Sequence, residues 1–144
     1  MLKQWIEKLL ARNAEPAHLK TGRWGEQQAV RFLKAKKCSV IGERVRVGKH
    51  DELDIISKCG DVLMFVEVKT RKNENYGRPF SAVNREKRKR LSRAAVTYLK
   101  KKNIKPEYIR FDVIEVIGEP GGQSPEIRHI ENAFQLAAPY KLWW

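Results

Sequence analysis

The sequence predicts an α/β fold in which helices flank a mixed central β-sheet. Its 144 residues are the length of one ordinary domain and leave little room for a second core. Apolar residues make up 42% of the chain, which is enough to bury such a core and argues against a disordered protein. Segments with helical periodicity and segments with strand periodicity follow one another in the order α-β-β-β-α-β-β, which is typical of a sheet covered by helices.

Two helices are predicted before the first strand. Residues 1–12 place apolar side chains on one side of a short amphipathic helix, which ends before Pro16. Residues 20–36 carry glycine and apolar residues at intervals of three and four, and these define one helical face. We assign residues 1–19 to an N-terminal amphipathic extension and begin the main domain at residue 20.

Three strands are predicted next, over residues 38–47, 52–57 and 62–70. They are rich in β-branched residues or alternate between apolar and polar residues, and the third has the strongest strand pattern in the chain. The turn Lys58-Cys59-Gly60-Asp61 separates the second strand from the third, so these two strands form a predicted hairpin.

The second half of the chain is predicted to hold one long helix and two strands. The helix covers residues 81–102, and Pro106 keeps it from continuing. Strands over residues 108–117 and 126–130 are joined by a Gly/Pro-rich turn, so they pair with each other. The main domain ends at residue 134, and residues 135–144 form a C-terminal tail.

The chain is strongly basic, with a formal net charge of +13 and a sequence pI near 10.0. Such a charge predicts an acidic partner, and nucleic acid is the commonest one, although an anionic membrane surface would attract the same excess. No apolar run approaches the roughly 18 residues that span a bilayer, and the first residues lack the apolar core of a signal peptide. We therefore expect a soluble cytoplasmic protein without a membrane partner.

The chain has two cysteines, Cys38 and Cys59, and neither has a second Cys or a His at metal-ligand spacing. The sequence therefore supports neither a zinc site nor a disulfide framework, and a reducing compartment fits. The three histidines, His18, His50 and His129, are widely separated, and we interpret them as structural or surface residues.

Polar residues of the predicted hairpin form a candidate catalytic group. Alternation along the third strand puts Glu67 and Lys69 on the same face. If the hairpin turns on the Cys59-Gly60 pair, Asp54 faces Phe65 and lies diagonal to Glu67 on that face. Two carboxylates and one ammonium group would then converge.

This group of side chains is suited to phosphodiester hydrolysis. Two carboxylates, together with water and a phosphate oxygen of the substrate, can hold Mg²⁺, which seldom has an all-protein cage, and Mn²⁺ suits the same oxygen ligands. The metal ion would polarise the phosphodiester and activate the attacking water. Lys69 would position or deprotonate that water, or stabilise the charge that develops on the phosphorane.

A simpler interpretation is that Asp54, Glu67 and Lys69 form a half-exposed, salt-bridged face, which is the commoner role of such residues. Glu26 favours the catalytic interpretation, because it lies on the glycine-containing apolar face of residues 20–36, where a carboxylate is costly without a cation. A partner Arg or Lys in the interior would explain Glu26 equally well.

Several sequence blocks together carry a resemblance to a known family. They are G-R-W-G-E-Q-Q-A (22–29), E-L-D-I-I (52–56), F-V-E-V-K-T-R (65–71), Y-G-R-P (76–79), A-V-N-R-E-K-R-K-R-L (82–91), R-F-D-V (110–113) and H-I-E-N-A-F (129–134). In this order they resemble the YraN-like family, whose members are classed by inference as bacterial endonucleases. That family is similar to the PD-(D/E)XK nuclease superfamily, including archaeal Holliday junction resolvases, and the resemblance covers residues 20–134.

The resemblance implies a restriction-endonuclease-like fold. In it, Asp54, Glu67 and Lys69 form the catalytic trio, and Glu26 is an additional acidic residue from the first helix of the domain. It also implies Mg²⁺ and a nucleic-acid substrate, with Asp54 and Glu67 holding the metal ion and Glu26 supporting that ion or a second one. Two positions depart from the family pattern, because Asp51 stands where the family usually has Gly and Arg44 where it usually has Asn.

The helix over residues 81–102 concentrates a third of the positive charge, since residues 85–105 contain ten Lys or Arg and one acidic residue. We interpret these cations as contacts to nucleic-acid phosphates, although a solvated helix face is the simpler alternative. Lys87 lies on the inward stripe and could reach the catalytic face instead. The predicted nucleic-acid-binding residues are Arg46, Arg71, Arg85, Lys87, Arg88, Lys89, Arg90 and Arg93. No aromatic residue interleaves with the helix cations, so we expect recognition of backbone or shape rather than base stacking.

The leading hypothesis is a Mg²⁺-dependent endonuclease that cuts DNA, rather than RNA, in branched or single-stranded regions. An enzyme that cuts both strands of a junction would act as a symmetric homodimer. The first alternative is a non-catalytic nucleic-acid-binding protein of the same fold. The second is an interaction protein that uses the N-terminal helix and the terminal Trp143-Trp144 pair to meet a partner or an anionic membrane.

Overall fold

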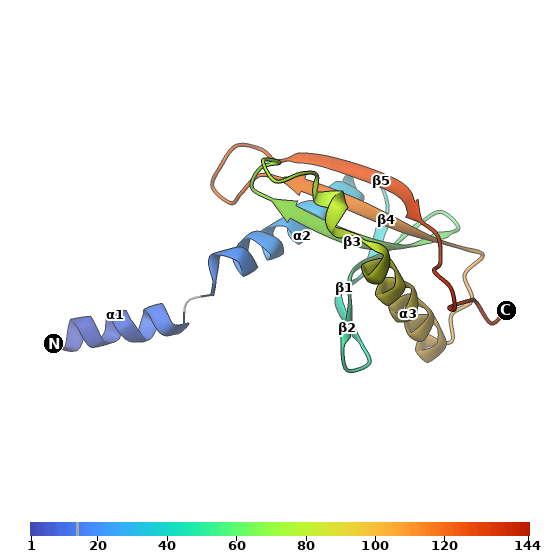
Figure 1. Ribbon diagram of the computed structural model, residues 1–144, viewed down its shortest axis with the longest axis horizontal. Coiled ribbons are helices and arrows are strands. Elements are labelled where there is room, and N and C mark those ends of the chain that lie inside the picture. The colour runs from blue at the N-terminus through green and yellow to red at the C-terminus, as the bar shows by residue number, and fades with distance from the viewer. Residues whose placement is uncertain (14) are drawn as a thin grey trace.

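The computed structural model describes residues 1–13 and 15–144 and confirms the predicted fold class, a mixed β-sheet flanked by helices (Figure 1). The elements are α1 (Leu2–Asn13), α2 (Ala17–Ala35), β1 (Ser39–Val47), β2 (Asp51–Cys59), β3 (Val62–Arg71), the 3-10 helix η1 (Pro79–Ala82), α3 (Arg85–Lys102), β4 (Tyr108–Ile117) and β5 (Glu126–Phe134). The strands lie in chain order across the sheet, with β3 and β4 parallel and the other neighbours antiparallel. This architecture is consistent with a restriction-endonuclease-like fold.

The sheet separates two apolar cores, one under α2 and one under α3. Alternation along β3 divides its side chains between them, because Leu63 and Phe65 lie in the α3 core whereas Met64 and Val66 lie in the α2 core. The helices contribute Ala29, Val30 and Leu33 from α2, and Leu91, Ala94, Ala95 and Leu99 from α3. The same alternation directs Glu67 toward α3.

The helix predicted over residues 1–12 is present as α1, and it projects away from the sheet (Figure 1). Its apolar side chains are exposed, including Leu2, Trp5 and Leu10. None of the helices in the described residues is long and apolar enough to cross a membrane.

The helix predicted over residues 81–102 is interrupted near its start. Residues Pro79–Ala82 form η1, and α3 begins only after Asn84. The Asn84 side-chain oxygen accepts a hydrogen bond from the Lys87 backbone N–H at 3.0 Å, which is the N-cap bond that asparagine favours. This cap places Lys87 in the first turn of α3, where its side chain reaches the sheet.

The strand predicted over residues 126–130 is longer in the structure and ends at Phe134. A β-bulge separates its two parts, and Asn132 adopts a left-handed backbone there with φ 49°. The bulge breaks the alternation from which a strand is predicted, which explains why the sequence pattern stopped early.

The predicted turn of the β2–β3 hairpin is wrong in register. Cys59 pairs with Val62, so Gly60-Asp61 forms the two-residue loop instead of Cys59-Gly60. Gly60 has φ 59°, a left-handed conformation that glycine adopts at little cost. The pairing is shifted by two positions, and a shift of two preserves the face on which each side chain lies.

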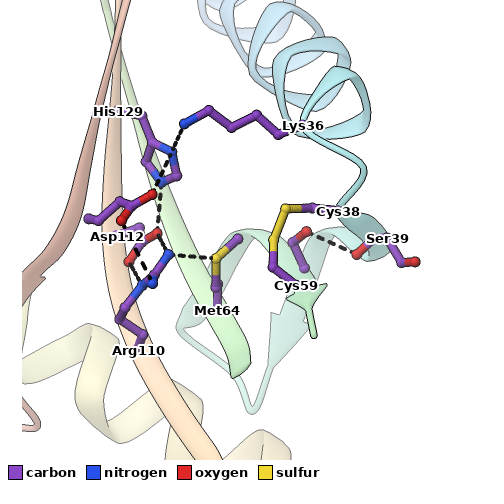
Figure 2. Close-up of a disulfide and its surroundings, with 10 residues drawn as sticks. Lys36, Cys38, Ser39, Cys59, Met64, Arg110, Asp112 and His129 are labelled. Carbon is purple, nitrogen blue, oxygen red and sulfur yellow. Dashed lines mark hydrogen bonds and ion pairs between the residues drawn. A yellow bond between two sulfur atoms is a disulfide. The ribbon is translucent and has the colours of Figure 1, made fainter. Parts of the chain in front are cut away.

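The prediction about the cysteines is also wrong, because Cys38 and Cys59 form a disulfide (Figure 2). Their Cα atoms are 4.6 Å apart, although 21 positions separate them in the chain. Ser39 pairs with Lys58 across β1 and β2, which brings the two residues beyond this pair together. Spacing along the sequence does not reveal such a contact, since it depends on strand register.

Candidate active site

Asp54 and Glu67 meet at the end of the β2–β3 ladder. The last pair of the ladder is Ile55 with Val66, and one further step in this register places Asp54 beside Glu67. Asp54 Oδ2 accepts a hydrogen bond from the Val68 backbone N–H at 2.9 Å. The aspartate side chain thus takes the place of a strand partner for the β3 backbone. The two predicted carboxylates are thus the next residues beyond the last ladder pair on neighbouring strands, and the charge of Glu67 acts on Asp54.

Glu67 is almost fully buried, with 4% of its side chain exposed, and it lies between two lysines. Its Oε1 is 3.3 Å from Lys69 Nζ and 3.3 Å from Lys87 Nζ of α3. Its Oε2 has no hydrogen-bond partner in the described residues. An unsatisfied buried carboxylate oxygen is costly, so Oε2 marks a position that favours a cation or a hydrogen-bond donor.

The surroundings of Asp54 disfavour its ionised form. Burial raises the pKa of Asp54 to about 8, and the negative charges of Glu67 and Glu26 contribute to the increase. The Val68 N–H and Lys87 act in the opposite direction but do not outweigh these effects. A cation bound between the two carboxylates would therefore stabilise the ionised form of Asp54.

Glu26 reaches the site because α2 crosses β3 closely at Gly25. A Cβ atom at Gly25 would lie 1.8 Å from Thr70 Oγ1, so only glycine allows this approach. Glu26 Oε2 accepts a hydrogen bond from Arg44 Nε of β1 at 2.6 Å. Glu26 thus has a cationic partner, but Arg44 is 43% exposed, whereas the sequence interpretation considered a partner in the interior. Arg44 stands at one of the two positions that depart from the family pattern.

Two hollows meet at Glu26. The smaller, of about 230 Å³, is lined by Arg23, Glu26, Gln27, Glu43, Arg44, Asp54 and Ile55. The larger, of about 510 Å³, is lined by His18, Thr21, Gly22, Glu26, Val68, Lys69, Thr70, Arg71 and Lys72. Asp54 therefore lines the smaller hollow and Lys69 the larger one, and Glu26 lines both.

The donor set fits a divalent ion that also binds water and substrate. No group of three or more His, Cys, Asp or Glu side chains within residues 1–13 and 15–144 is arranged to hold a metal ion. Asp54 and Glu67 nevertheless offer two neighbouring carboxylates, one resisting ionisation and the other with a free buried oxygen. Mg²⁺ commonly takes one or two carboxylates and completes its shell with water and phosphate oxygens.

The second departure from the family pattern, Asp51, does not add free charge to the site. Its two carboxylate oxygens accept hydrogen bonds from Arg93 at 2.8 and 2.7 Å, and these bonds lower the pKa of Asp51. The pair connects the start of β2 to α3.

The predicted nucleic-acid-binding residues fall into two groups. The first group, which is exposed and forms no ion pair among the described residues, is Arg46, Arg71, Arg85, Lys89 and Arg90. The other three have partners within the protein. Lys87 contacts Glu67, and Arg93 binds Asp51. Arg88 donates to the Val83 carbonyl at 3.0 Å and lies over the rings of Phe80 and Phe134.

Sequence patterns did not indicate a second polar cluster, which links α2 to β4 and β5 (Figure 2). Asp112 accepts hydrogen bonds from Arg110 at 2.7 and 2.8 Å and lies 2.7 Å from His129 Nε2. Lys36 Nζ lies 3.0 Å from His129 Nδ1. Burial acts to raise the pKa of Asp112, but the bonds from His129 and Arg110 lower it overall. His129 is therefore a structural residue, as interpreted from the sequence.

Comparison with known proteins places this chain in a family. A model described as "Uncharacterised protein family UPF0102" matches residues 25–116. Similar proteins include a UPF0102 protein of Geotalea daltonii, which is 45% identical over 116 residues, or 81% of this chain and 90% of the relative. A UPF0102 protein of Symbiobacterium thermophilum is 44% identical over 115 residues (80% and 96%), and one of Dictyoglomus turgidum is 38% identical over 113 residues (78% and 95%). The matched segment contains all the acidic and lysine residues of the candidate site.

Proposed function

The chain belongs to the uncharacterised protein family UPF0102, in agreement with the YraN-like resemblance, and we propose that it is a Mg²⁺-dependent endonuclease that hydrolyses phosphodiester bonds in DNA. The observation that supports this proposal best is the meeting of Asp54 and Glu67 beside Lys69. We propose branched or single-stranded DNA as the substrate, Mn²⁺ as a second usable ion, and the cytoplasm as the place of action.

In this proposal, Asp54 and Glu67 hold the metal ion, and Glu26 supports it from α2. Mg²⁺ supplies a Lewis acid that polarises the phosphodiester and lowers the pKa of a bound water. Lys69 is fixed by Glu67 Oε1, on the same carboxylate as the unpartnered Oε2. From there its ammonium group can donate a hydrogen bond to the attacking water or to an oxygen on which negative charge develops.

Lys87 has a different role in this proposal. It approaches Glu67 from α3, on the same oxygen as Lys69, and balances the charge of a carboxylate that is almost fully buried. Its position in the first turn of α3, beside the exposed Arg85 and Lys89, connects the site to the surface proposed to bind the DNA backbone.

A cleavage assay tests the proposal. The protein is incubated with branched, single-stranded and fully paired DNA in Mg²⁺, in Mn²⁺ and in EDTA. We expect nicking that requires the metal ion and is lost in Glu67→Gln and in Lys69→Ala. Lys101→Ala, an exposed lysine at the far end of α3, is the matched control and keeps full activity. Cleavage that persists in both site variants would indicate a contaminating nuclease and contradict the assignment.

A second candidate, a non-catalytic nucleic-acid-binding protein of the same fold, is favoured by one specific observation. The carboxylates already have cationic partners, because Glu67 contacts two lysines and Glu26 binds Arg44. Metal-independent DNA binding without cleavage of any substrate would support this candidate. Sedimentation of the protein with and without junction DNA would test the homodimer that cutting of both strands requires.

A further inference from the structure

Tyr76 is the most exposed tyrosine of the chain. It lies in the loop between β3 and η1, and its relative exposure is 103%. No other described part of the protein covers its ring. A large side chain of this kind would gain roughly 1.5–3 kcal/mol if it were buried, so an ordered loop that presents it to solvent needs an explanation.

The loop that carries Tyr76 is built by specific contacts. The Asn73 side chain accepts a hydrogen bond from the Asn75 N–H at 3.1 Å, and the Gly77 N–H donates to the Glu74 carbonyl at 3.0 Å. These bonds close a turn with Tyr76 at its tip, and Gly77 adopts φ 107°, which favours glycine. The Glu74 carboxylate also forms an ion pair with Arg128 of β5.

The return leg of the loop is anchored on a fully buried carboxylate. Glu115 of β4 accepts hydrogen bonds from Arg78 Nη2 and from the Phe80 N–H, both at 2.8 Å, and these bonds lower the pKa of Glu115 although its burial opposes the decrease. Glu115 has 0% exposure and pairs with Lys69 in the sheet. Arg78, two residues after Tyr76, is thus bound to the sheet at Glu115, the strand partner of the candidate catalytic Lys69.

The surroundings of Tyr76 favour a nucleic-acid base over an apolar protein partner. Its neighbours in the loop are polar or glycine, so there is no apolar patch to which a protein could dock. The segment that leads from the site to the loop ends in exposed Arg71 and Lys72, which line the same hollow as Lys69. Lys72 and Arg71 precede Tyr76 by four and five residues in the chain, and cations together with an exposed aromatic ring are the combination found in single-strand-binding surfaces.

We propose that Tyr76 stacks on an unpaired base of the nucleic acid while Arg71 and Lys72 bind the adjoining phosphates. Bases inside a duplex are already stacked on both sides, so this surface selects single strands, ends or junctions with an unpaired nucleotide next to the proposed cut. The inference rests on the proposed function and names a residue that would select its substrate. It departs from the sequence-based expectation that recognition involves backbone and shape without stacking.

Binding measurements with a fluorescent base test this inference without cleavage. The full chain is titrated, in EDTA, into a single-stranded oligonucleotide that contains 2-aminopurine and into the fully paired duplex of the same sequence. Wild type is expected to quench the base in the single strand. Tyr76→Ala is expected to bind the single strand about ten-fold more weakly and to lose the quenching, while its duplex affinity changes less than about two-fold. Tyr76→Phe and Tyr76→Trp retain a stacking ring and should bind like wild type.

Tyr108 provides the matched control. It is also exposed, at 57%, but lies at the start of β4, opposite Val62, whereas Arg71 pairs with Ile117 at the other end of the same two strands. Tyr108→Ala should leave binding and quenching unchanged. Single-strand binding by Tyr76→Ala at wild-type affinity, or an equal loss for single strand and duplex, would overturn the inference.

The failure of this inference and the failure of the proposed function are distinguishable. If wild type cleaves DNA with Mg²⁺ but Tyr76→Ala binds single strands normally, the stacking surface is wrong and the nuclease assignment stands. If Tyr76 controls single-strand binding but wild type cleaves no DNA, the stacking inference holds and the nuclease assignment is wrong.

Discussion

At the scale of single residues, the candidate site is a charge balance around Asp54 and Glu67. Two lysines share one oxygen of Glu67, the other oxygen has no partner in the described chain, and Asp54 holds its proton more tightly than an ordinary aspartate. One further positive charge near Glu67 Oε2 and Asp54 would stabilise both carboxylates in their ionised form. In the proposed function, a divalent ion provides that charge.

The raised pKa of Asp54 predicts how stability depends on pH in the absence of metal. Because the folded pKa is about 8 and an unfolded aspartate has a pKa of about 3.9, the folded state holds the proton more tightly. The contribution of this group to stability is therefore greatest below about pH 4 and falls as the pH rises toward 8, at up to about 1.4 kcal/mol per pH unit. Asp54→Asn removes this loss, so in EDTA its Tm should exceed that of wild type more at pH 8 than at pH 5.

Thermal unfolding of both proteins at the two pH values checks this prediction. Asparagine keeps a side-chain oxygen for the Val68 N–H, so the variant should fold. An advantage that is the same at both pH values, or larger at pH 5, would contradict the raised pKa.

Lys87 gives a second prediction at this scale. Lys87→Met removes one of the two cations on the buried Glu67 and should destabilise the metal-free protein by about 1–3 kcal/mol. The added stability in saturating Mg²⁺ should be larger than in wild type, because the ion then replaces a missing charge. Denaturant unfolding with and without Mg²⁺ measures both effects. Lys89→Met, two positions along α3 and exposed, is the control, and an equal response of the two variants would refute the role of Lys87.

At the scale of elements, the site depends on how α2 and β2 meet β3. The alternation of β3 and the spacing of Gly22, Gly25 and Glu26 were readable in the sequence, because helix and strand periods determine which side chains share a face. The exact hairpin turn, the Cys38–Cys59 disulfide and the contact of Lys36 with His129 were not readable. These three features depend on register or on residues far apart in the chain, which local patterns do not determine.

The crossing of α2 over β3 is tested by adding one carbon atom. A Cβ at Gly25 would lie within 2.8 Å of three atoms of Thr70, so Gly25→Ala should destabilise the protein by about 1–3 kcal/mol and displace Glu26. Gly22→Ala meets nothing within 4 Å and should be neutral or stabilise by up to about 1 kcal/mol through helix propensity. Urea unfolding of both variants checks this. Equal effects would mean that α2 does not approach β3 as the structure shows.

At the scale of the whole molecule, the net charge of +13 does not by itself show which cations bind a partner. Arg88 and Arg93, which the sequence suggested as phosphate contacts, have partners within the protein, whereas the exposed Arg85, Lys89 and Arg90 form no ion pair among the described residues. The composition predicts an acidic partner as a class, but it does not distinguish exposed cations from those that are engaged within the protein.

The salt dependence of DNA binding tests which cations bind phosphates. Replacing Arg85, Lys89 and Arg90 together by Ala should reduce the slope of log Kd against log salt by about three, roughly one for each phosphate that is no longer neutralised. The control replaces exposed Lys100, Lys101 and Lys102 at the other end of α3 and removes the same charge. Equal slopes for the two triple variants would indicate non-specific attraction instead of an α3 N-terminal binding surface.

The central claim is that Asp54 and Glu67 jointly bind a divalent ion. The most direct measurement is an anomalous difference map from crystals of the full chain soaked in Mn²⁺. We expect a peak at coordination distance from an oxygen of each carboxylate, and no such peak in crystals of Glu67→Gln. A wild-type map with Mn²⁺ bound elsewhere, or with no peak between these two side chains, would contradict the claim.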